Sequence, residues 1–346
     1  MISKYFINKY KSLRKQSYLN KIVSYQYKYA FIGAGSHSIA NLYPCIKYLN
    51  VPLKYICTRN KKNAVAMAAG FIGCSGTDDM NSILNDEEIK GVFICTQASS
   101  HYELTKKCLQ ANKNVFVEKP ICFSLEELKD LIKIQANNIC MTGLQRRFSV
   151  INRSLVDQKL QTQHYHYRYL TGAYPDGDLA YELFIHPIDN VVQLFGNAVV
   201  SQITKIKAGD NATYFIHLLH NHKIMGALEL STNYTWSSAA EFLEINTEKE
   251  IFQCHYPNRL TGIKKTQTLL NIPVEKIFHK PITQNIYFDN SGFSPILNNN
   301  NLFVQGFYGE IEHFVASTEE NKKDEFTHLN SLLNTYAVLD QIKSAK

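Results

Sequence analysis

Short apolar runs alternate with amphipathic segments along residues 28–147. Buried strands are predicted by YAFI (29–32), VPLKYICT (51–58), GVFICT (91–96), NVFVEKP (114–120) and ICMTGL (139–144). Helices are predicted over 63–69, 101–111 and 124–135, the last opened by Ser124 with Glu127 three residues on. This alternation favours a parallel sheet covered on both faces, with a ligand site beyond the C-terminal ends of its strands.

The pattern changes after about residue 150. HYHYRYL (164–170), VVSQITKIK (199–207), TYFIHLLH (213–220), KIMGALELSTNY (223–234) and AAEFLEINT (239–247) alternate like strands, with few helices between them. They predict a large, mostly antiparallel open sheet, with helices over 178–195, 306–317 and 328–343. The fold class is therefore α/β plus α+β. The expected units are a basic arm (1–24), a dinucleotide-binding domain (25–147) and a substrate-binding and oligomerisation domain (148–346).

The first strand runs into Gly33-Ala34-Gly35, followed by Ser36, His37 and a helix-compatible segment. Strand, glycine turn and helix in this order are what a Rossmann domain needs at its first crossover, where Gly33 permits the turn and Gly35 the approach of a pyrophosphate. Ser38 stands where a third glycine is usual, and it is small enough for the helix to pack closely. An ordinary strand-to-helix loop is the alternative interpretation.

The end of the second strand is the usual place for an acidic residue that binds the ribose hydroxyls of NAD. Thr58, Arg59 and Asn60 stand there instead. A hydroxyl beside a guanidinium suits a 2′-phosphate, so the sequence favours NADP(H) over NAD(H), which stays possible. Solvated loop charges are the alternative.

Two further segments carry groups suited to hydride-transfer chemistry. Glu118-Lys119-Pro120 ends a buried strand, where a lysine can polarise a substrate oxygen. Glu182 and His186 lie four apart on a predicted helix, so the carboxylate is expected to orient an imidazole that exchanges a proton. A histidine satisfied within its own helix is the alternative. Arg147, after the last strand of the first domain, and Tyr174, before the His186 helix, are candidate substrate contacts.

Taken together, these residues resemble the Gfo/Idh/MocA family, named for glucose-fructose oxidoreductase, inositol dehydrogenase and a rhizopine-catabolism protein. The resemblance covers roughly residues 27–345 and includes CTQASSH (95–101), EKP (118–120), GLQRRF (143–148) and the helix with His186. It implies cofactor contacts at Thr96, Gln97, His101, Glu118 and Lys119, with His101 in a positional role. It implies catalytic roles for Lys119 and His186, with Glu182 in place of the family's aspartate, and a structural or substrate-facing Asp189. It also implies an open sheet that commonly forms dimers.

Charge and cysteine usage narrow the possibilities. Residues 1–77 hold 12 Lys and Arg and no Asp or Glu, whereas the whole chain has a net charge of +7. Nucleotide phosphates are a sufficient partner for this excess, and no nucleic-acid-binding module is evident. Ile2, Phe6, Tyr10 and Leu13 predict an amphipathic helix in the arm, packed on its own domain or a partner subunit, with membrane attachment as the less favoured alternative.

The eight cysteines lack metal-ligand spacing and are expected to be free core residues in a reducing compartment, so we expect a cytoplasmic protein without a metal site. His164, His166 and Arg168 alternate with Tyr165, Tyr167 and Tyr169, which favours a polar subunit interface over an anion site.

The sequence thus predicts an NADP(H)-dependent oxidoreductase that interconverts a secondary alcohol and a ketone on a sugar, cyclitol or nucleotide sugar, acting as a homo-oligomer. Two alternatives remain open. One is a non-catalytic NADP-binding regulatory or scaffold protein, because the third glycine is missing and Glu182 replaces an aspartate. The other is a glycosidase that uses hydride transfer only transiently.

Overall fold

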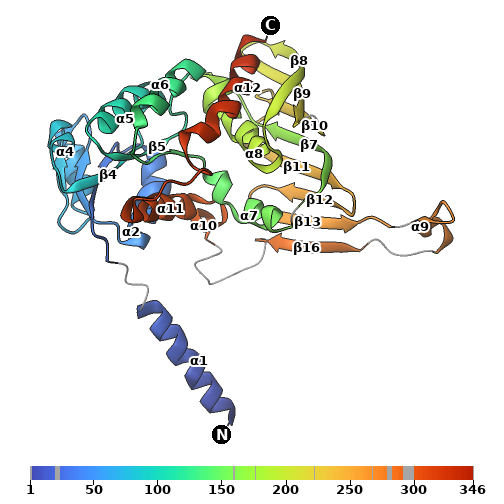
Figure 1. Ribbon diagram of the computed structural model, residues 1–346, viewed down its shortest axis with the longest axis horizontal. Coiled ribbons are helices and arrows are strands. Elements are labelled where there is room, and N and C mark those ends of the chain that lie inside the picture. Colours follow the sequence, from blue (N-terminus) through green and yellow to red (C-terminus); the bar gives the residue numbers. More distant parts are fainter. Residues whose placement is uncertain are drawn as a thin grey trace.

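The computed structural model describes residues 2–19, 24–158, 160–175, 177–221, 223–266, 268–278, 283–290 and 300–345. Two sheets lie side by side, and a separate N-terminal helix, α1 (Ile2–Leu19), projects away from both (Figure 1). The predicted fold class is confirmed: a parallel six-stranded sheet is followed by a large, mostly antiparallel one.

The first sheet has the strand order β3-β2-β1-β4-β5-β6, and every pairing in it is parallel. This is the order of a doubly wound dinucleotide fold. Its strands are β1 (Lys28–Ile32), β2 (Leu53–Cys57), β3 (Ser75–Thr77), β4 (Ile89–Ile94), β5 (Asn114–Glu118) and β6 (Cys140–Gly143). Its helices are α2 (Tyr43–Leu49), α3 (Lys61–Ala68), α4 (Asn81–Leu84), α5 (His101–Gln110) and α6 (Leu125–Gln135). The strands are almost wholly buried, as their continuous apolar runs predicted.

The second sheet has the order β16-β13-β12-β11-β7-β10-β9-β8, in which only the β7–β10 pair is parallel. Its strands are β7 (Thr162–Leu170), β8 (Ala198–Ala208), β9 (Asn211–His220), β10 (Ile224–Ser231), β11 (Ala240–Thr247), β12 (Glu250–His255), β13 (Arg259–Lys264) and β16 (Gln284–Asp289). Along β7 the tyrosines are buried and His164, His166 and Arg168 are exposed, as the alternation predicted. Helix α8 (Ile185–Phe195) is buried beside this sheet.

Several elements were not predicted from the sequence. They are strands β3, β12, β13 and β16, helices α4, α7 (Val150–Asp157) and α10 (Asn301–Val304), and a small hairpin, β14 (Thr268–Leu269) and β15 (Ile272–Pro273), followed by α9 (Val274–Ile277). Short 3-10 turns cover Ala98–Ser100, Gln145–Phe148, Trp236–Ser238 and Leu329–Leu332. Two π-helical segments, Ser38–Leu42 and Leu179–Phe184, precede α2 and α8. Both lie next to the candidate site, where such irregular turns are often found.

The C-terminal helices join the two halves. Helix α11 (Phe307–Glu320) was assigned from the sequence to the second domain, but its Phe314 ring lies 5.2 Å from Phe93 and 5.9 Å from Phe116 of the first sheet. Tyr29 on β1 also donates to Glu319 at 2.8 Å. Helix α12 (Leu333–Ser344) contacts both α6 and α8. The chain therefore returns to its first domain, because the apolar face of α11 completes the cover of the parallel sheet.

Candidate nucleotide and catalytic site

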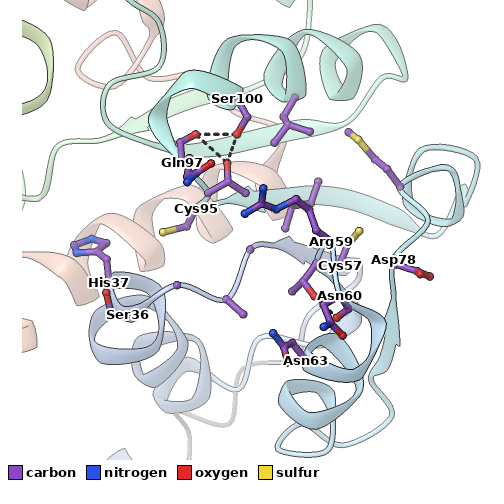
Figure 2. Close-up of a pocket in the computed structure, with 18 residues that line it drawn as sticks. Ser36, His37, Cys57, Arg59, Asn60, Asn63, Asp78, Cys95, Gln97 and Ser100 are labelled. Carbon is purple, nitrogen blue, oxygen red and sulfur yellow. Dashed lines mark hydrogen bonds between the residues drawn. The ribbon is translucent and has the colours of Figure 1, made fainter. Parts of the chain in front are cut away.

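The glycine turn after β1 forms one wall of a cavity of about 750 Å³. Gly33 has a φ of +114°, and a Cβ there would lie 1.9 Å from the Cys95 carbonyl oxygen, so only glycine fits. A Cβ on Gly35 would meet nothing within 4 Å, so the backbone there is open to a ligand. Figure 2 shows Ser36 and His37 at one end of this turn and Asn60 and Asn63 at the other.

Ser38 replaces the third glycine without disturbing the turn. Its side chain is buried and its hydroxyl donates to the Gly35 carbonyl at 2.8 Å. Tyr43 in α2 donates to the Gly33 carbonyl at 2.7 Å. The Ser38 and Tyr43 hydroxyls thus both hold the glycine turn in place. The exchange of the third glycine for serine leaves the shape of the turn compatible with a pyrophosphate.

Ten of the predicted cofactor residues line this cavity: Gly33, Ala34, Gly35, Ser36, His37, Thr58, Arg59, Asn60, Thr96 and Gln97. The sequence did not single out the remaining lining residues, which are Ile32, Cys57, Asn63, Asp78, Met80, Cys95, Ser100 and Leu104. The cavity has the volume, the open glycine backbone and the polar lining that a dinucleotide needs. The apolar members were not foreseen because nothing in their type distinguishes them from core residues.

The cavity wall after β2 carries Arg59. Thr58 and Asn60 are occupied locally: the Thr58 hydroxyl donates to the Asn60 carbonyl at 2.7 Å, and the Asn60 side chain accepts from Lys62 N at 2.9 Å as the N-cap of α3. Arg59 has no ion-pair partner among the described residues, and its guanidinium is available to a phosphate. Asp78, after β3, lines the same cavity and would repel a 2′-phosphate, so the two side chains favour opposite cofactors.

The loop after β4 is tied together by its own side chains. Thr96 and Ser100 hydroxyls lie 2.8 Å apart and Ser100 donates to the Gln97 carbonyl at 2.8 Å (Figure 2). His101 is 1% exposed, and its ring nitrogens lie 2.8 Å from the Pro120 carbonyl and 3.1 Å from that of Thr96. His101 therefore lies behind the cavity wall and connects the β4 and β5 loops.

Glu118 and Lys119 leave β5 next to the cavity but do not line it. The Glu118 carboxylate lies 3.2 Å from His37 Nε2, so it contacts a residue that does. Lys119 Nζ donates to the backbone carbonyl of Glu182 at 2.6 Å. Burial, the largest cause, lowers the pKa of Lys119. Lys119 thus reaches from the nucleotide domain to the segment that carries the candidate imidazole.

His186, in the first turn of α8, is 9% exposed, and its Nδ1 has no hydrogen-bond partner among the described residues. Burial holds its pKa well below 6.5, and the positive charges of Arg146 and Lys119 lower it further. The imidazole is therefore neutral near pH 7. A buried, unpartnered ring nitrogen beside Lys119 is an available proton acceptor.

Glu182 does not hold His186, contrary to the expectation from their spacing. Its carboxylate accepts hydrogen bonds from the Tyr174 hydroxyl at 3.0 Å and from Asp178 N at 3.1 Å. The reason is the π-helical segment Leu179–Phe184, which ends between Glu182 and His186, so the α-helical spacing rule does not apply. Glu182 instead fixes the loop that carries Tyr174 and presents its carbonyl to Lys119.

Arg147 and Asp189 form a buried pair, not an open substrate contact. Arg147 Nε and Nη2 donate to the Asp189 carboxylate at 2.8 and 2.6 Å, and Nη1 donates to the Phe326 carbonyl and the Ser331 hydroxyl. Their side chains are 4% and 3% exposed. Every Arg147 nitrogen is engaged, which argues for a structural role. The pair joins α8 to the turn after β6 and to the chain before α12.

Arg146 precedes Arg147 in the turn after β6, and its positive charge acts on His186. Arg146 Nε donates to Glu241 of β11 at 2.7 Å, and Tyr167 of β7 donates to the same carboxylate at 2.5 Å. Arg146 Nη1 is buried without a partner among the described residues. In the sequence, only its place after a predicted parallel strand pointed to Arg146. Its partner Glu241 is 95 residues away, so no local pattern could reveal the pair.

Glu310 is the other unexpected group. It lies on α11 with no exposed surface, and neither carboxylate oxygen has a hydrogen-bond partner among the described residues. Burial, and then the charge of Glu118, raises its pKa well above 4.5. Glu310 is therefore a neutral acid behind the Glu118–His37 contact.

Within the described part of the chain, no cluster of three or more His, Cys, Asp or Glu side chains has the geometry to hold a metal ion, and no helix is long and apolar enough to cross a membrane. All eight cysteines are free, as predicted, and only Cys74 is not buried.

The fold and this cavity define a two-domain protein with a nucleotide-binding Rossmann domain. Residues 27–145 match the sequence model of an oxidoreductase family with an NAD-binding Rossmann fold. Over these residues the chain is similar to the Gfo/Idh/MocA oxidoreductases, in agreement with the resemblance noted from its motifs.

Individual relatives match over limited segments. The uncharacterized oxidoreductase YhhX of Escherichia coli (strain K12) is 32% identical over 136 residues, which are 35% of this chain and 39% of YhhX. The inositol 2-dehydrogenase of Salmonella typhimurium (strain LT2) is 27% identical over 124 residues, 32% of this chain and 37% of that protein. The matched segments thus span less than half of the length of these relatives.

Two solved structures extend the likeness of fold to most of the chain. The UDP-N-acetylglucosamine 3-dehydrogenase GnnA from Acidithiobacillus ferrooxidans has a TM-score of 0.71 and 18% identity, covering 91% of this chain and 96% of its own. KijD10, a 3-ketoreductase from Actinomadura kijaniata in complex with NADP, has a TM-score of 0.71 and 12% identity, with the same coverage. At this identity the likeness concerns the fold alone.

Proposed function

We propose that this protein is an NADP(H)-dependent oxidoreductase that interconverts a secondary alcohol and a ketone on a sugar, cyclitol or nucleotide sugar. The observation that carries the proposal is the meeting of Lys119 with the segment that holds His186, next to a nucleotide cavity. The names of the relatives support the substrate class, since they include an inositol dehydrogenase and enzymes named as a nucleotide-sugar dehydrogenase and a 3-ketoreductase.

The cavity residues fit a dinucleotide in four ways. The Gly33–Gly35 turn leaves room for a pyrophosphate, and Arg59 would pair with a 2′-phosphate. The Thr96 loop forms the opposite wall. His37, at the end of the turn, contacts the carboxylate of Glu118, the residue before Lys119. A bound nicotinamide would exchange hydride with the substrate carbon, and the side chains described here handle the proton and the charge.

His186 and Lys119 divide that work. In the oxidation direction the neutral imidazole accepts the proton of the substrate hydroxyl, and in reduction it returns one to the new oxygen. The Lys119 ammonium donates a hydrogen bond to the same oxygen and stabilises negative charge that develops there. Burial strengthens both interactions, since water is excluded from around them. Burial, and then the positive charges of Arg146 and Lys119, favour the neutral imidazole.

A dehydrogenase assay over inositols, free sugars and UDP- and TDP-linked sugars with both cofactors tests this function. We expect Lys119→Met and His186→Asn each to lower kcat/KM about a hundredfold or more while NADPH binding is retained. Lys107→Met, on the exposed side of α5, is the matched control. If Lys119→Met binds NADPH normally and turns over at the wild-type rate, the assignment is wrong.

The same assay separates the two alternatives left open by the sequence. NADPH binding with no turnover of any substrate in the panel would favour a regulatory protein. Substrate cleavage over many turnovers without net consumption of cofactor would favour a glycosidase that uses transient hydride transfer.

A further inference from the structure

Helix α1 lies outside the region matched by the family and has no role in the nucleotide site. Figure 1 shows it apart from both sheets, and the side chains of residues 4–15 are all exposed. The packing of this helix on its own domain, expected as one possibility from the sequence, is therefore absent for these side chains. The helix itself, predicted from the spacing of its apolar residues, is present.

Apolar side chains follow one line along the helix and basic side chains follow another, and Tyr5 and Ile7 are exposed outside both lines. Phe6, Tyr10 and Leu13, at i, i+4 and i+7, form one apolar stripe and are 62%, 62% and 56% exposed. Lys4, Lys11 and Lys15, at i, i+7 and i+11, share another face. Lys9 and Arg14 lie at the two edges of the apolar stripe, where long basic side chains reach from an apolar layer to water. The helix has no acidic residue.

We propose that α1 binds the surface of an anionic phospholipid bilayer, with the Phe6–Tyr10–Leu13 stripe in the interfacial layer and the basic residues on lipid headgroups. An aromatic stripe opposite a basic face is the pattern of helices that lie in the plane of a membrane. Such a helix does not cross the bilayer, and this one is not apolar enough to do so.

The positive charge of α1 argues against a second copy of the helix, and its apolar stripe argues against a nucleic acid, as the partner of this surface. Two copies of α1 would bring five positive charges against five with no acidic partner, so pairing between copies is opposed by repulsion. A nucleic acid would satisfy the basic face but leave the aromatic stripe in water, because its backbone offers no apolar phase. An anionic lipid surface supplies both negative charge and an apolar layer.

Co-sedimentation of the full chain with vesicles tests the proposal. We expect binding to phosphatidylcholine vesicles that contain about one third phosphatidylglycerol, weaker binding in high salt, and little binding to pure phosphatidylcholine. Removal of residues 2–19 should abolish binding. Lys9→Glu/Arg14→Glu should weaken it more than about tenfold, since each basic residue near such a surface contributes about fivefold. Phe6→Ser/Tyr10→Ser should also weaken it about tenfold or more.

Matched controls lie far from the helix. Lys249→Glu/Lys264→Glu makes the same change of charge on the exposed side of the second domain, and Ile72→Ser removes a fully exposed apolar side chain. Neither should alter vesicle binding, and retained NADPH affinity would verify that each variant is folded. The proposal is overturned if the full chain ignores anionic vesicles, if it binds them equally without residues 2–19, or if those residues prove to hold a lipid-free dimer together.

Discussion

Lys119 Nζ lies 2.6 Å from the backbone carbonyl oxygen of Glu182, and this contact connects the nucleotide domain to the helix that carries His186. The lysine contacts the main chain of Glu182, and the Glu182 carboxylate points to Tyr174 and Asp178. In the proposed mechanism, Lys119 and the His186 segment are therefore connected through a backbone carbonyl and not through a carboxylate–imidazole dyad.

Glu182→Gln should lower kcat/KM less than about tenfold, because the carbonyl that Lys119 contacts is unchanged and His186 gives up no hydrogen bond. Tyr174→Phe should have a similar small effect, since it removes the partner of the same carboxylate. Steady-state kinetics of both variants beside His186→Asn checks this. A loss of a hundredfold or more in Glu182→Gln, with the KM unchanged, would instead support a carboxylate–imidazole dyad.

Alcohol oxidation should keep its full rate well below pH 6.5. The reaction needs a neutral imidazole, and burial together with Arg146 and Lys119 holds the pKa of His186 well below 6.5. His186 is therefore protonated at a lower pH than an ordinary histidine. The pH profile of kcat/KM measures this shift. A half-maximal rate at pH 6.5 or higher would contradict it.

Arg59→Ala should weaken NADPH binding about tenfold to a hundredfold and leave NADH binding nearly unchanged, because a charge-assisted hydrogen bond to the 2′-phosphate is lost. Asp78→Asn should act in the opposite direction and strengthen NADPH binding, since it removes a negative charge from the same cavity. Fluorescence titration with both cofactors measures the two effects, with Lys61→Ala as the control. Equal losses for NADPH and NADH in Arg59→Ala would mean that Arg59 binds another part of the cofactor.

Asp189→Asn should lower the free energy of unfolding by about 3–5 kcal/mol, because it leaves the buried Arg147 guanidinium without its counter-charge. Urea denaturation followed by circular dichroism measures the change. Asp157→Asn, on the exposed end of α7, is the control and should change stability by less than about 0.5 kcal/mol. A stable Asp189→Asn protein with a raised KM would restore the substrate role that the sequence suggested for this pair.

Glu310→Gln should make the protein more stable above neutral pH. The native state keeps Glu310 protonated, whereas the unfolded chain loses that proton above a pKa of about 4.5, so wild-type stability falls as pH rises through this window. The slope is at most about 1.4 kcal/mol per pH unit for one group. The glutamine variant cannot ionise, so this part of the slope should disappear.

Unfolding free energies at several pH values between about 5 and 8 test this prediction for Glu310. Glu320→Gln, an exposed position on the same helix, should leave the slope as it is in the wild type. Identical slopes in wild type and Glu310→Gln would mean that Glu310 is ionised in the folded protein.

Features that depend on local residue pattern could be predicted from the sequence. Period-two and continuous apolar runs identify strands such as β1, β5 and β7, because burial on one or both faces leaves a direct mark on residue type. The glycine turn could also be predicted from the sequence, because a turn that accepts only glycine at Gly33 leaves that residue type as a mark. The amphipathic arm helix followed from spacing alone.

Contacts between side chains far apart in the sequence could not be predicted in this way. The Arg146–Glu241 and Arg147–Asp189 pairs join residues 95 and 42 positions apart, and the return of α11 to the first sheet joins Glu319 to Tyr29 across 290 positions. No local pattern encodes such pairings, because they arise from how the two sheets pack. The π-helical segment before α8 likewise turns the Glu182 side chain away from His186. Hydrogen bonding and packing determine such a segment, and the spacing of residues in the sequence does not reveal it.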